Sequence, residues 1–350
     1  MNDEPGARPP EGREQTDWLE AGAPLTLSAP PLGDHPTNHT EGSSFGRIKF
    51  QDRRWLHLLL FLLTLGSTTI VGDGWYGSFA LEYLPDHPTV SATAQWLHGL
   101  WYSGTILAIL ASHEFGHYFA CRYYDVDASL PFFLPMPYLL TGTLGAVIRI
   151  REPIPSKRMW FDIGIAGPIA GFLIAVPALF IGVWMSRVEQ PIPIAQLPPG
   201  LLNLAMGEPL LFRLATWLAW GPIADGYALN WHPVAVAGWF GLIVTAFNLL
   251  PVAQLDGGHI SYAVFGRRSS NVTIAALILV VACTYFSRSW IVWGGLMCLM
   301  LVLYGRHHPR TFDENDPLDR PRLMLAWAAL AIFVLCFTPA PLELVGVTGR

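Results

Sequence analysis

The chain contains a succession of apolar segments, each close to the length that crosses a lipid bilayer. A membrane-spanning helix needs about 20 predominantly apolar residues, because a rise of about 1.5 Å per residue must cover about 30 Å of hydrocarbon. Seven segments meet or approach this length, at residues 55–72, 96–121, 159–186, 233–251, 271–286, 289–305 and 322–338. The segment at 271–286 is the shortest of them. The sequence therefore predicts an all-α polytopic membrane protein with six to seven transmembrane helices.

The composition agrees with a membrane protein. Hydrophobic residues make up 52% of the chain and charged residues only 13%, about half of what soluble domains carry. The formal net charge of −5 does not favour a nucleic-acid partner, and the lipid bilayer is the expected surrounding. Four cysteines lie in or beside apolar segments without CxxC spacing, and we expect small core residues rather than disulfides or metal ligands. They are Cys121, Cys283, Cys298 and Cys336.

The first fifty residues differ from the rest of the chain. They are polar and rich in Pro and Gly, and cannot bury enough apolar area to fold alone. We expect a disordered tail at 1–50, followed by one membrane domain at 51–340. The tail has no apolar run after its start, so it does not resemble a secretory signal, and it is too acidic for an organelle transit peptide.

Positive charges predict the direction of the spans, because Lys and Arg gather on the cytoplasmic side of a membrane. Arg47, Lys49, Arg53 and Arg54 precede the first apolar segment, which places the N-terminus in the cytoplasm. Alternating spans then bring the basic loops after the second and sixth segments to the same side. We expect an integral membrane protein, in the plasma membrane of a bacterium, with a cytoplasmic N-terminus.

Two further apolar segments do not fit a simple spanning helix. Residues 130–150 contain three prolines, followed by Thr and Gly, which a regular helix would not tolerate. We expect a re-entrant, partly sheet-like loop there. Residues 201–220 carry Glu208, Pro209 and Arg213, and crossing at this point would place every later basic loop outside. An interfacial or re-entrant helix is the interpretation that preserves the topology.

The second apolar segment ends in "HEFGH", which places His113, Glu114 and His117 in or beside hydrocarbon. An ionisable group there costs about 2.5 to 3.5 kcal/mol on insertion scales, so such residues mark binding sites. His113 and His117 are four residues apart on one helix, so both imidazoles project from the same face and can hold one metal ion. Glu114 lies close enough to contact a water molecule on that metal without being a ligand. This arrangement is typical of zinc hydrolases.

A catalytic zinc site needs a third protein ligand. The soluble pattern HExxHxxGxxH is excluded, because Ala120 and Tyr123 stand where it needs Gly and His. Asp256 is the best candidate, since it lies at the inner end of the fourth apolar segment, at the depth and on the side of His117. By its position alone, Asp256 could equally be a solvated cap or turn residue.

The two motifs together resemble the site-2 protease family of intramembrane zinc metalloproteases. HEFGH on one span is joined by the pattern N-x-x-P-x-x-x-L-D-G on another, formed by Asn248, Pro251, Leu255, Asp256 and Gly257. The stretches "GTLGAVIRI" at 142–150 and "FDIGIAGPIAGF" at 161–172 are similar to the family's membrane-associated loop and third core helix. The resemblance covers residues 96–268, the expected catalytic core, and is closest to the branch without a PDZ domain, seen in cyanobacteria and plastids.

This resemblance implies a function and a role for each site residue. His113, His117 and Asp256 would bind one Zn²⁺ ion per chain, and Glu114 would act as the general base. Asn248 would be a polar donor near the scissile carbonyl. The substrate would be a transmembrane segment of another membrane protein, cut within or near the bilayer during regulated intramembrane proteolysis.

Other polar residues receive structural interpretations. His259, three residues after Asp256, could face the site, but a satisfied helix-end histidine is the expectation. His307 and His308 are expected to form a solvated cytoplasmic pair. Gly167 and Gly171 form a small-xxx-small pattern that predicts a helix-packing face. Two polar residues receive no interpretation: Asp162 and Asn203.

Two other classes of function are alternatives for a membrane protein with such a motif. A membrane di-iron oxidase would need several histidine boxes, and the chain has a single histidine pair at i, i+4 spacing. A catalytically inactive metal-binding scaffold or transporter could keep the motif as a structural metal site. The intact Glu114 argues against that alternative, because structural zinc needs no base.

Overall fold

The structure is a computed structural model that describes residues 52–80, 91–191, 204–252, 254–305 and 311–344. The expected tail at 1–50 lies outside these residues, as do Asn203, His307 and His308. The helices are α1 Arg54–Ala80, α2 Ala92–Tyr123, α3 Lys157–Met185, α4 Leu210–Trp220, α5 Pro233–Asn248, α6 Asp256–Phe265, α7 Ser269–Cys283, α8 Ser289–Tyr304 and α9 Arg320–Cys336.

Within the described residues, three short antiparallel strand pairs accompany the helices. They are β1 Phe132–Pro135 with β2 Thr143–Val147, β3 Arg187–Glu189 with β5 Ala228–Asn230, and β4 Leu204–Met206 with β6 Leu342–Leu344. The prediction of a mainly helical chain is confirmed, with small additions of β structure.

Within the described residues, three helices are long and apolar enough to cross a membrane by length and composition: Arg54–Ala80, Lys157–Met185 and Asp256–Cys283. The number of six to seven spans therefore stays a prediction. The expected segment at 271–286 corresponds to α7, and the preceding helical residues extend this apolar stretch back to Asp256. A short 3₁₀ helix, η2 Gly266–Arg268, joins α6 to α7.

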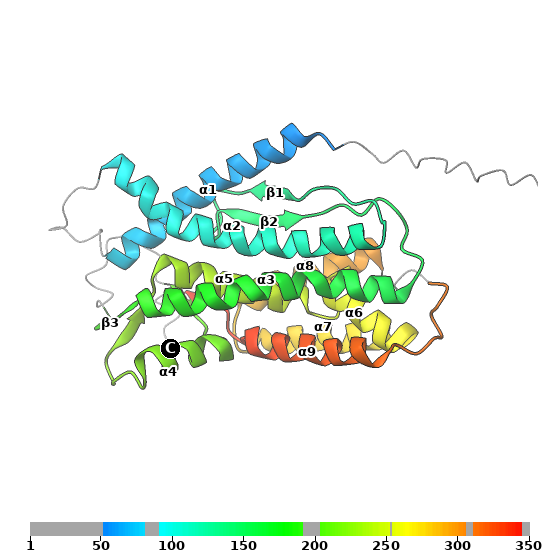
Figure 1. The fold of residues 1–350 in the computed structure, drawn as a ribbon. Coiled ribbons are helices and arrows are strands. Elements are labelled where there is room, and N and C mark those ends of the chain that lie inside the picture. The colour runs from blue at the N-terminus through cyan, green and yellow to red at the C-terminus, as the bar shows by residue number, and fades with distance from the viewer. Residues whose placement is uncertain (1–51, 81–90, 192–203, 253, 306–310, 345–350) are drawn as a thin grey trace, which may run out of the picture. The chain divides into compact units, whose positions relative to one another are not determined.

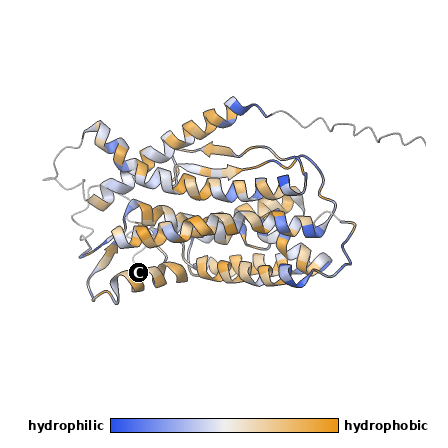
Figure 2. Ribbon diagram, in the orientation of Figure 1, coloured by the Kyte–Doolittle hydropathy of each residue, from blue (hydrophilic) through white to orange (hydrophobic). Residues whose placement is uncertain are grey.

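Helices α2, α3 and α5 form the centre of the described bundle. In Figure 1, α2 and α3 lie side by side, the β1–β2 hairpin lies on the α1 and α2 side, and α9 lies on the opposite side of α3. Nearly every residue of α5 is buried, whereas Figure 2 shows hydrophilic residues gathered mainly toward the ends of the helices. The polar residues of "HEFGH" are therefore enclosed by packed apolar helices.

The close approach of α2 and α3 depends on a missing side chain. A Cβ atom added at Gly116 would lie 2.5 Å from the backbone oxygen of Ala166, well inside van der Waals contact. Only glycine lets the two backbones approach so closely at this point. This contact places the histidine-bearing helix directly against α3.

The segment at 130–150 forms the β1–β2 hairpin, which confirms its predicted sheet-like character. Phe132 pairs with Val147, and the register shifts at a bulge between Leu134 and Pro135. Hydrogen bonds tie the connecting turn to neighbouring helices: Ser67 Oγ donates to Gly142 O at 2.8 Å, Trp75 Nε1 to Leu140 O at 3.1 Å, and Tyr102 Oη to Thr141 O at 3.0 Å. The hairpin is thus held against α1 and α2.

The segment at 201–220 contains β4 and the helix α4, within its described part. Helix α4 has 11 residues, which span about 16 Å, half of the hydrocarbon thickness. A helix of this length cannot cross a bilayer, in agreement with the interfacial or re-entrant interpretation. All four cysteines are free; Cys121, Cys283 and Cys336 are buried as expected, but Cys298 is exposed.

Candidate metal centre

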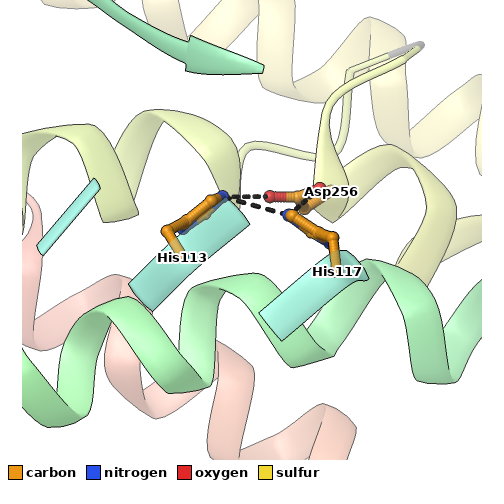
Figure 3. A group of neighbouring side chains, drawn as sticks. All are labelled: His113, His117 and Asp256. Atoms are coloured by element: carbon orange, nitrogen blue, oxygen red, sulfur yellow. Dashed lines mark hydrogen bonds and ion pairs between the residues drawn. The ribbon is translucent and has the colours of Figure 1, made fainter. Parts of the chain in front are cut away.

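Three side chains from two helices converge on one point (Figure 3). His113 and His117 project from α2, and Asp256 is the first residue of α6. The two histidine Nε2 atoms are 3.1 Å apart, and each lies 3.3 Å from one carboxylate oxygen of Asp256. Both histidines are buried, with 4% and 7% of their surface exposed. The structure therefore brings together the three residues that were predicted from the sequence to be metal ligands.

The spacing of the three donor atoms fits a tetrahedral metal ion. Zinc binds imidazole nitrogen and carboxylate oxygen at about 2.0 to 2.2 Å, so two ligands at the tetrahedral angle are about 3.3 Å apart. The observed separations of 3.1 and 3.3 Å match this value. Two imidazoles and one carboxylate are also the donor types that zinc accepts in catalytic sites.

Hydrogen bonding leaves the Nε2 atom of His117 available as a ligand. The Nδ1 atom of His117 lies 2.7 Å from the backbone oxygen of Ile163 on α3. A carbonyl oxygen can only accept, so Nδ1 carries the proton, and the neutral ring presents its lone pair at Nε2. A hydrogen bond of this kind orients most metal-binding histidines. The sequence could not reveal this partner, because any residue supplies a backbone oxygen.

Two glycines of α3 make room for the imidazoles. A Cβ atom at Gly167 would overlap the ring of His117, and one at Gly171 would lie 3.1 Å from the Cβ of His113. The small-xxx-small pattern was predicted to be a helix-packing face. That face packs against the two candidate ligands themselves, so the pattern belongs to the site.

The position of Asp256 corrects one detail of the sequence analysis. Asp256 is not on the fourth apolar helix, because α5 ends at Asn248 and a turn precedes α6. Pro251 lies in that turn, and a Cβ atom at Gly257 would overlap the backbone of Leu249. Glycine is therefore required where α6 begins against the end of α5, and this contact returns Asp256 to the level of Asn248.

Glu114 lies beside the candidate ligands and has a backbone partner. The side chain is buried, and its carboxylate accepts a hydrogen bond from the N–H of Ile148, just after β2. Glu114 also lines a cavity of about 250 Å³ that His113 and His117 share. A carboxylate that is not a ligand thus faces the space where a substrate and a water molecule could lie.

Asn248 and His259 also line this cavity. The Nδ2 atom of Asn248 lies 3.1 Å from His113 Nε2, so the predicted donor is within the site. His259 lies in the first turn of α6, as a helix-end residue should, and it also faces the site, the alternative that its spacing left open. It lines the cavity, and its ring stacks on Trp160 with centroids 4.4 Å apart. Its spacing of three residues from Asp256, which puts both on one helix face, was the signal.

A histidine pair at helical spacing, a glutamate beside it and a distant carboxylate define a centre of the metallopeptidase class. Comparison with known families agrees with this class. The sequence model of peptidase family M50 matches residues 101–286, more than half of the 350 residues. The chain belongs to this family, and the resemblance to site-2 proteases is confirmed.

The chain is also similar to chloroplastic zinc metalloproteases of plants, in agreement with the expected resemblance to the plastid branch of the family. The probable zinc metalloprotease EGY1, chloroplastic, of Arabidopsis thaliana is 28% identical over 304 residues, covering 81% of this chain and 52% of the relative. EGY1 of Oryza sativa subsp. japonica is 32% identical, covering 68% and 40%. EGY2 of Oryza sativa subsp. indica is 26% identical, covering 81% and 48%. The chain spans about half the length of these relatives. No solved structure matches the chain significantly.

We expect Gly167→Ala to weaken Zn²⁺ binding strongly, because the added methyl group overlaps the His117 ring. Gly171→Ala should have a smaller effect, because the added methyl group would make a close contact with His113 but would not overlap it. Gly104→Ala is the matched control, because nothing lies within 4 Å of a Cβ atom there. The atoms that the added methyl group meets at Gly167 belong to the end of the His117 side chain and not to the backbone. Rotation of that ring can therefore relieve the overlap, and we expect zinc binding to be lost without loss of folding. Zinc titration and thermal unfolding of the purified variants would measure both; equal affinities for Gly104→Ala and Gly167→Ala would contradict the idea.

Proposed function

We propose that this chain is an intramembrane zinc metalloprotease that hydrolyses peptide bonds within or near transmembrane segments of membrane-protein substrates. The observation that carries the proposal is the buried cluster of His113, His117 and Asp256 with Glu114 beside it. Membership of peptidase family M50 and the names of the relatives support zinc as the metal. The chain spans about half of the length of those relatives. The proposal therefore rests on the residues of this chain's own site.

Each residue of the site has a distinct proposed role. His113, His117 and Asp256 hold the ion, and the Ile163 carbonyl keeps the His117 ring in place. When bound, zinc supplies Lewis-acid activation of a water molecule and of the scissile carbonyl.

The two remaining polar side chains transfer a proton or donate a hydrogen bond. Glu114 accepts a proton from the attacking water at its carboxylate and passes it to the leaving amine. The Nδ2 group of Asn248 donates a hydrogen bond toward the substrate carbonyl. Regulated intramembrane proteolysis is the process that such an activity would serve.

We predict that Glu114→Gln keeps zinc but loses cleavage, because the amide cannot accept the proton. Loss of a general base typically costs about 10²- to 10⁴-fold in rate. Asp256→Ala should lose both zinc and cleavage, since it removes a ligand. Metal analysis and cleavage of a single-span test substrate by the purified variants would measure these effects. A Glu114→Gln protein that still cleaves at the wild-type rate would show that Glu114 is not the general base, and a wild-type protein that binds zinc without cleaving would indicate a structural metal centre.

The edge of β2 supplies a place for an unwound substrate. The Ser129 N–H donates to the Arg149 carbonyl oxygen at 3.0 Å, and the Arg149 N–H donates to Ser129 Oγ at 2.9 Å. The backbone N–H and C=O groups of Arg149 therefore face the β1 side. Since backbone groups alternate along a strand, the N–H groups of Ala146 and Ile148 face the opposite edge. The Ile148 N–H reaches Glu114 there. A peptide lying along this edge would therefore pass the proposed base.

Unwinding is needed before a transmembrane helix can be cut. An intact helix holds its carbonyls in hydrogen bonds to the N–H four residues on. In hydrocarbon each freed backbone group costs several kcal/mol unless it finds another partner. Addition of the substrate as a strand beside β2 would supply such partners.

We therefore expect Gly, Asn or Pro near the cytoplasmic end of a substrate span to speed cleavage, and Leu-rich replacements to slow it. Ala146→Pro should slow cleavage with zinc retained, because it removes an N–H from the free edge. Ala146→Ser keeps that N–H and is the matched control. Cleavage rates for paired substrates, with zinc content, would test this. Equal rates for both substrates, together with a fully active Ala146→Pro enzyme, would exclude strand addition.

We further propose the arrangement of the chain in the membrane. Six to seven spans within a membrane domain at 51–340, with the core at 96–268, account for the basic loops. The N-terminus would be cytoplasmic. A bacterial plasma membrane is the proposed location, and the chloroplastic names of the relatives make a plastid membrane the alternative.

Cysteine labelling would test this direction. In a Cys298→Ser background, Asp316→Cys should resist an impermeant reagent added from outside, and Gln190→Cys should react with it. Both positions are exposed, so a difference reports sidedness. Labelling of Asp316→Cys from outside would contradict the topology.

A further inference from the structure

Arg322, at the start of α9, joins three helices near the candidate metal centre. Its Nε donates to Asp162 Oδ1 at 2.9 Å and its Nη2 to Asp162 Oδ2 at 2.5 Å, a two-point contact. Its Nη1 donates to Asp319 at 2.8 Å, and its Nη2 also contacts the hydroxyl of Tyr124 at the end of α2. Tyr124 in turn donates to Asp162. Lysine could not reproduce this planar two-point geometry.

The segment before α9 makes a second set of contacts, with the first residues of α3. Asp313 accepts hydrogen bonds from Ser156 Oγ at 2.6 Å and from the Lys157 N–H at 2.7 Å. Burial raises the pKa of Asp313, but the hydrogen bonds lower it by more, so the pKa of this carboxyl lies below its usual range. The buried Lys157 ammonium donates to the backbone oxygen of Glu314 at 3.0 Å. Residues 311–322 therefore hold the beginning of α3 at two points.

The held part of α3 is the part that orients His117. Asp162 directly precedes Ile163, whose carbonyl accepts the Nδ1–H of His117 at 2.7 Å. Gly167, one turn later, lies against the same ring. A hydrogen bond of this length is lost when the two groups separate by less than 1 Å, since about 3.5 Å is already too long. The position of the His117 ring thus depends on where α3 begins.

We propose that Arg322 is a positioning residue of the metal centre. Through Asp162 it fixes the first turns of α3, and so holds the Ile163 carbonyl that keeps His117 in its metal-binding orientation. The inference rests on the proposed function, since it concerns the same site. Arg322 lies outside residues 101–286 that match the family. The chain beyond the matched region therefore completes the site.

Zinc affinity of the purified full chain, measured by competition with a chelator, tests the proposal. Outer partners of metal ligands are worth about 10- to 100-fold in metal affinity, and we expect Arg322→Gln to lose affinity within that range. Arg213→Gln is the matched control, because Arg213 is exposed on α4 and its ion-pair partner, Glu208, directly precedes that helix. The absorption spectrum of the Co²⁺-loaded protein should change for Arg322→Gln and not for the control, since it reports ligand geometry.

A charge exchange keeps the test decisive if Arg322→Gln does not fold. Asp162→Arg and Arg322→Asp should each weaken zinc binding, and the double variant should recover part of it. Wild-type zinc affinity and Co²⁺ spectrum in folded Arg322→Gln, or no recovery in a folded double variant, would overturn the positioning role while leaving the proposed function intact. A wild-type chain that binds no zinc would overturn both.

Discussion

The polar groups of α2 are buried, and each needs a partner that α2 itself cannot supply. His117 finds the Ile163 carbonyl on α3, Glu114 finds the N–H of Ile148 after β2, and both histidines face Asp256 on α6. A buried polar group left without its partner costs about 1 to 3 kcal/mol. The same contacts that prepare the site therefore fix how α3, the β1–β2 hairpin and α6 pack around α2.

Packing and chemistry use the same residues of α3. Helix α3 lies so close to α2 that its Ile163 carbonyl reaches the His117 imidazole. No space remains for a side chain over that ring, and the residue of α3 at this point is Gly167. Gly116 on α2 makes the complementary approach to Ala166. In a bilayer, where apolar side chains give helices little reason to associate, such close contacts are a main source of packing. A substitution that loosens this interface would also displace a candidate ligand.

Local spacing in the sequence was enough to predict one half of the site. His113, Glu114 and His117 were recognised because a helix repeats every 3.6 residues, and Asp256 because the expected topology brought it to the same side. The partnership of Asp162 with Arg322 could not be predicted, since 160 residues separate them and nothing in either neighbourhood records the packing of α9. Gly167 was recognised as a packing residue, but only the three-dimensional structure shows that its neighbour is an imidazole. His259 was visible by spacing, and its stacking on Trp160 was not.

The pattern N-x-x-P-x-x-x-L-D-G acquires a geometric meaning from the turn between α5 and α6. Asn248 ends one helix and Asp256 begins the next, yet both lie at the same cavity. Pro251 lies in the turn that separates them, and its carbonyl is held by Thr273 Oγ1 at 2.8 Å. Gly257 then lets the new helix begin against the backbone of Leu249. The turn thus places a hydrogen-bond donor and a candidate ligand side by side, facing the two histidines of α2.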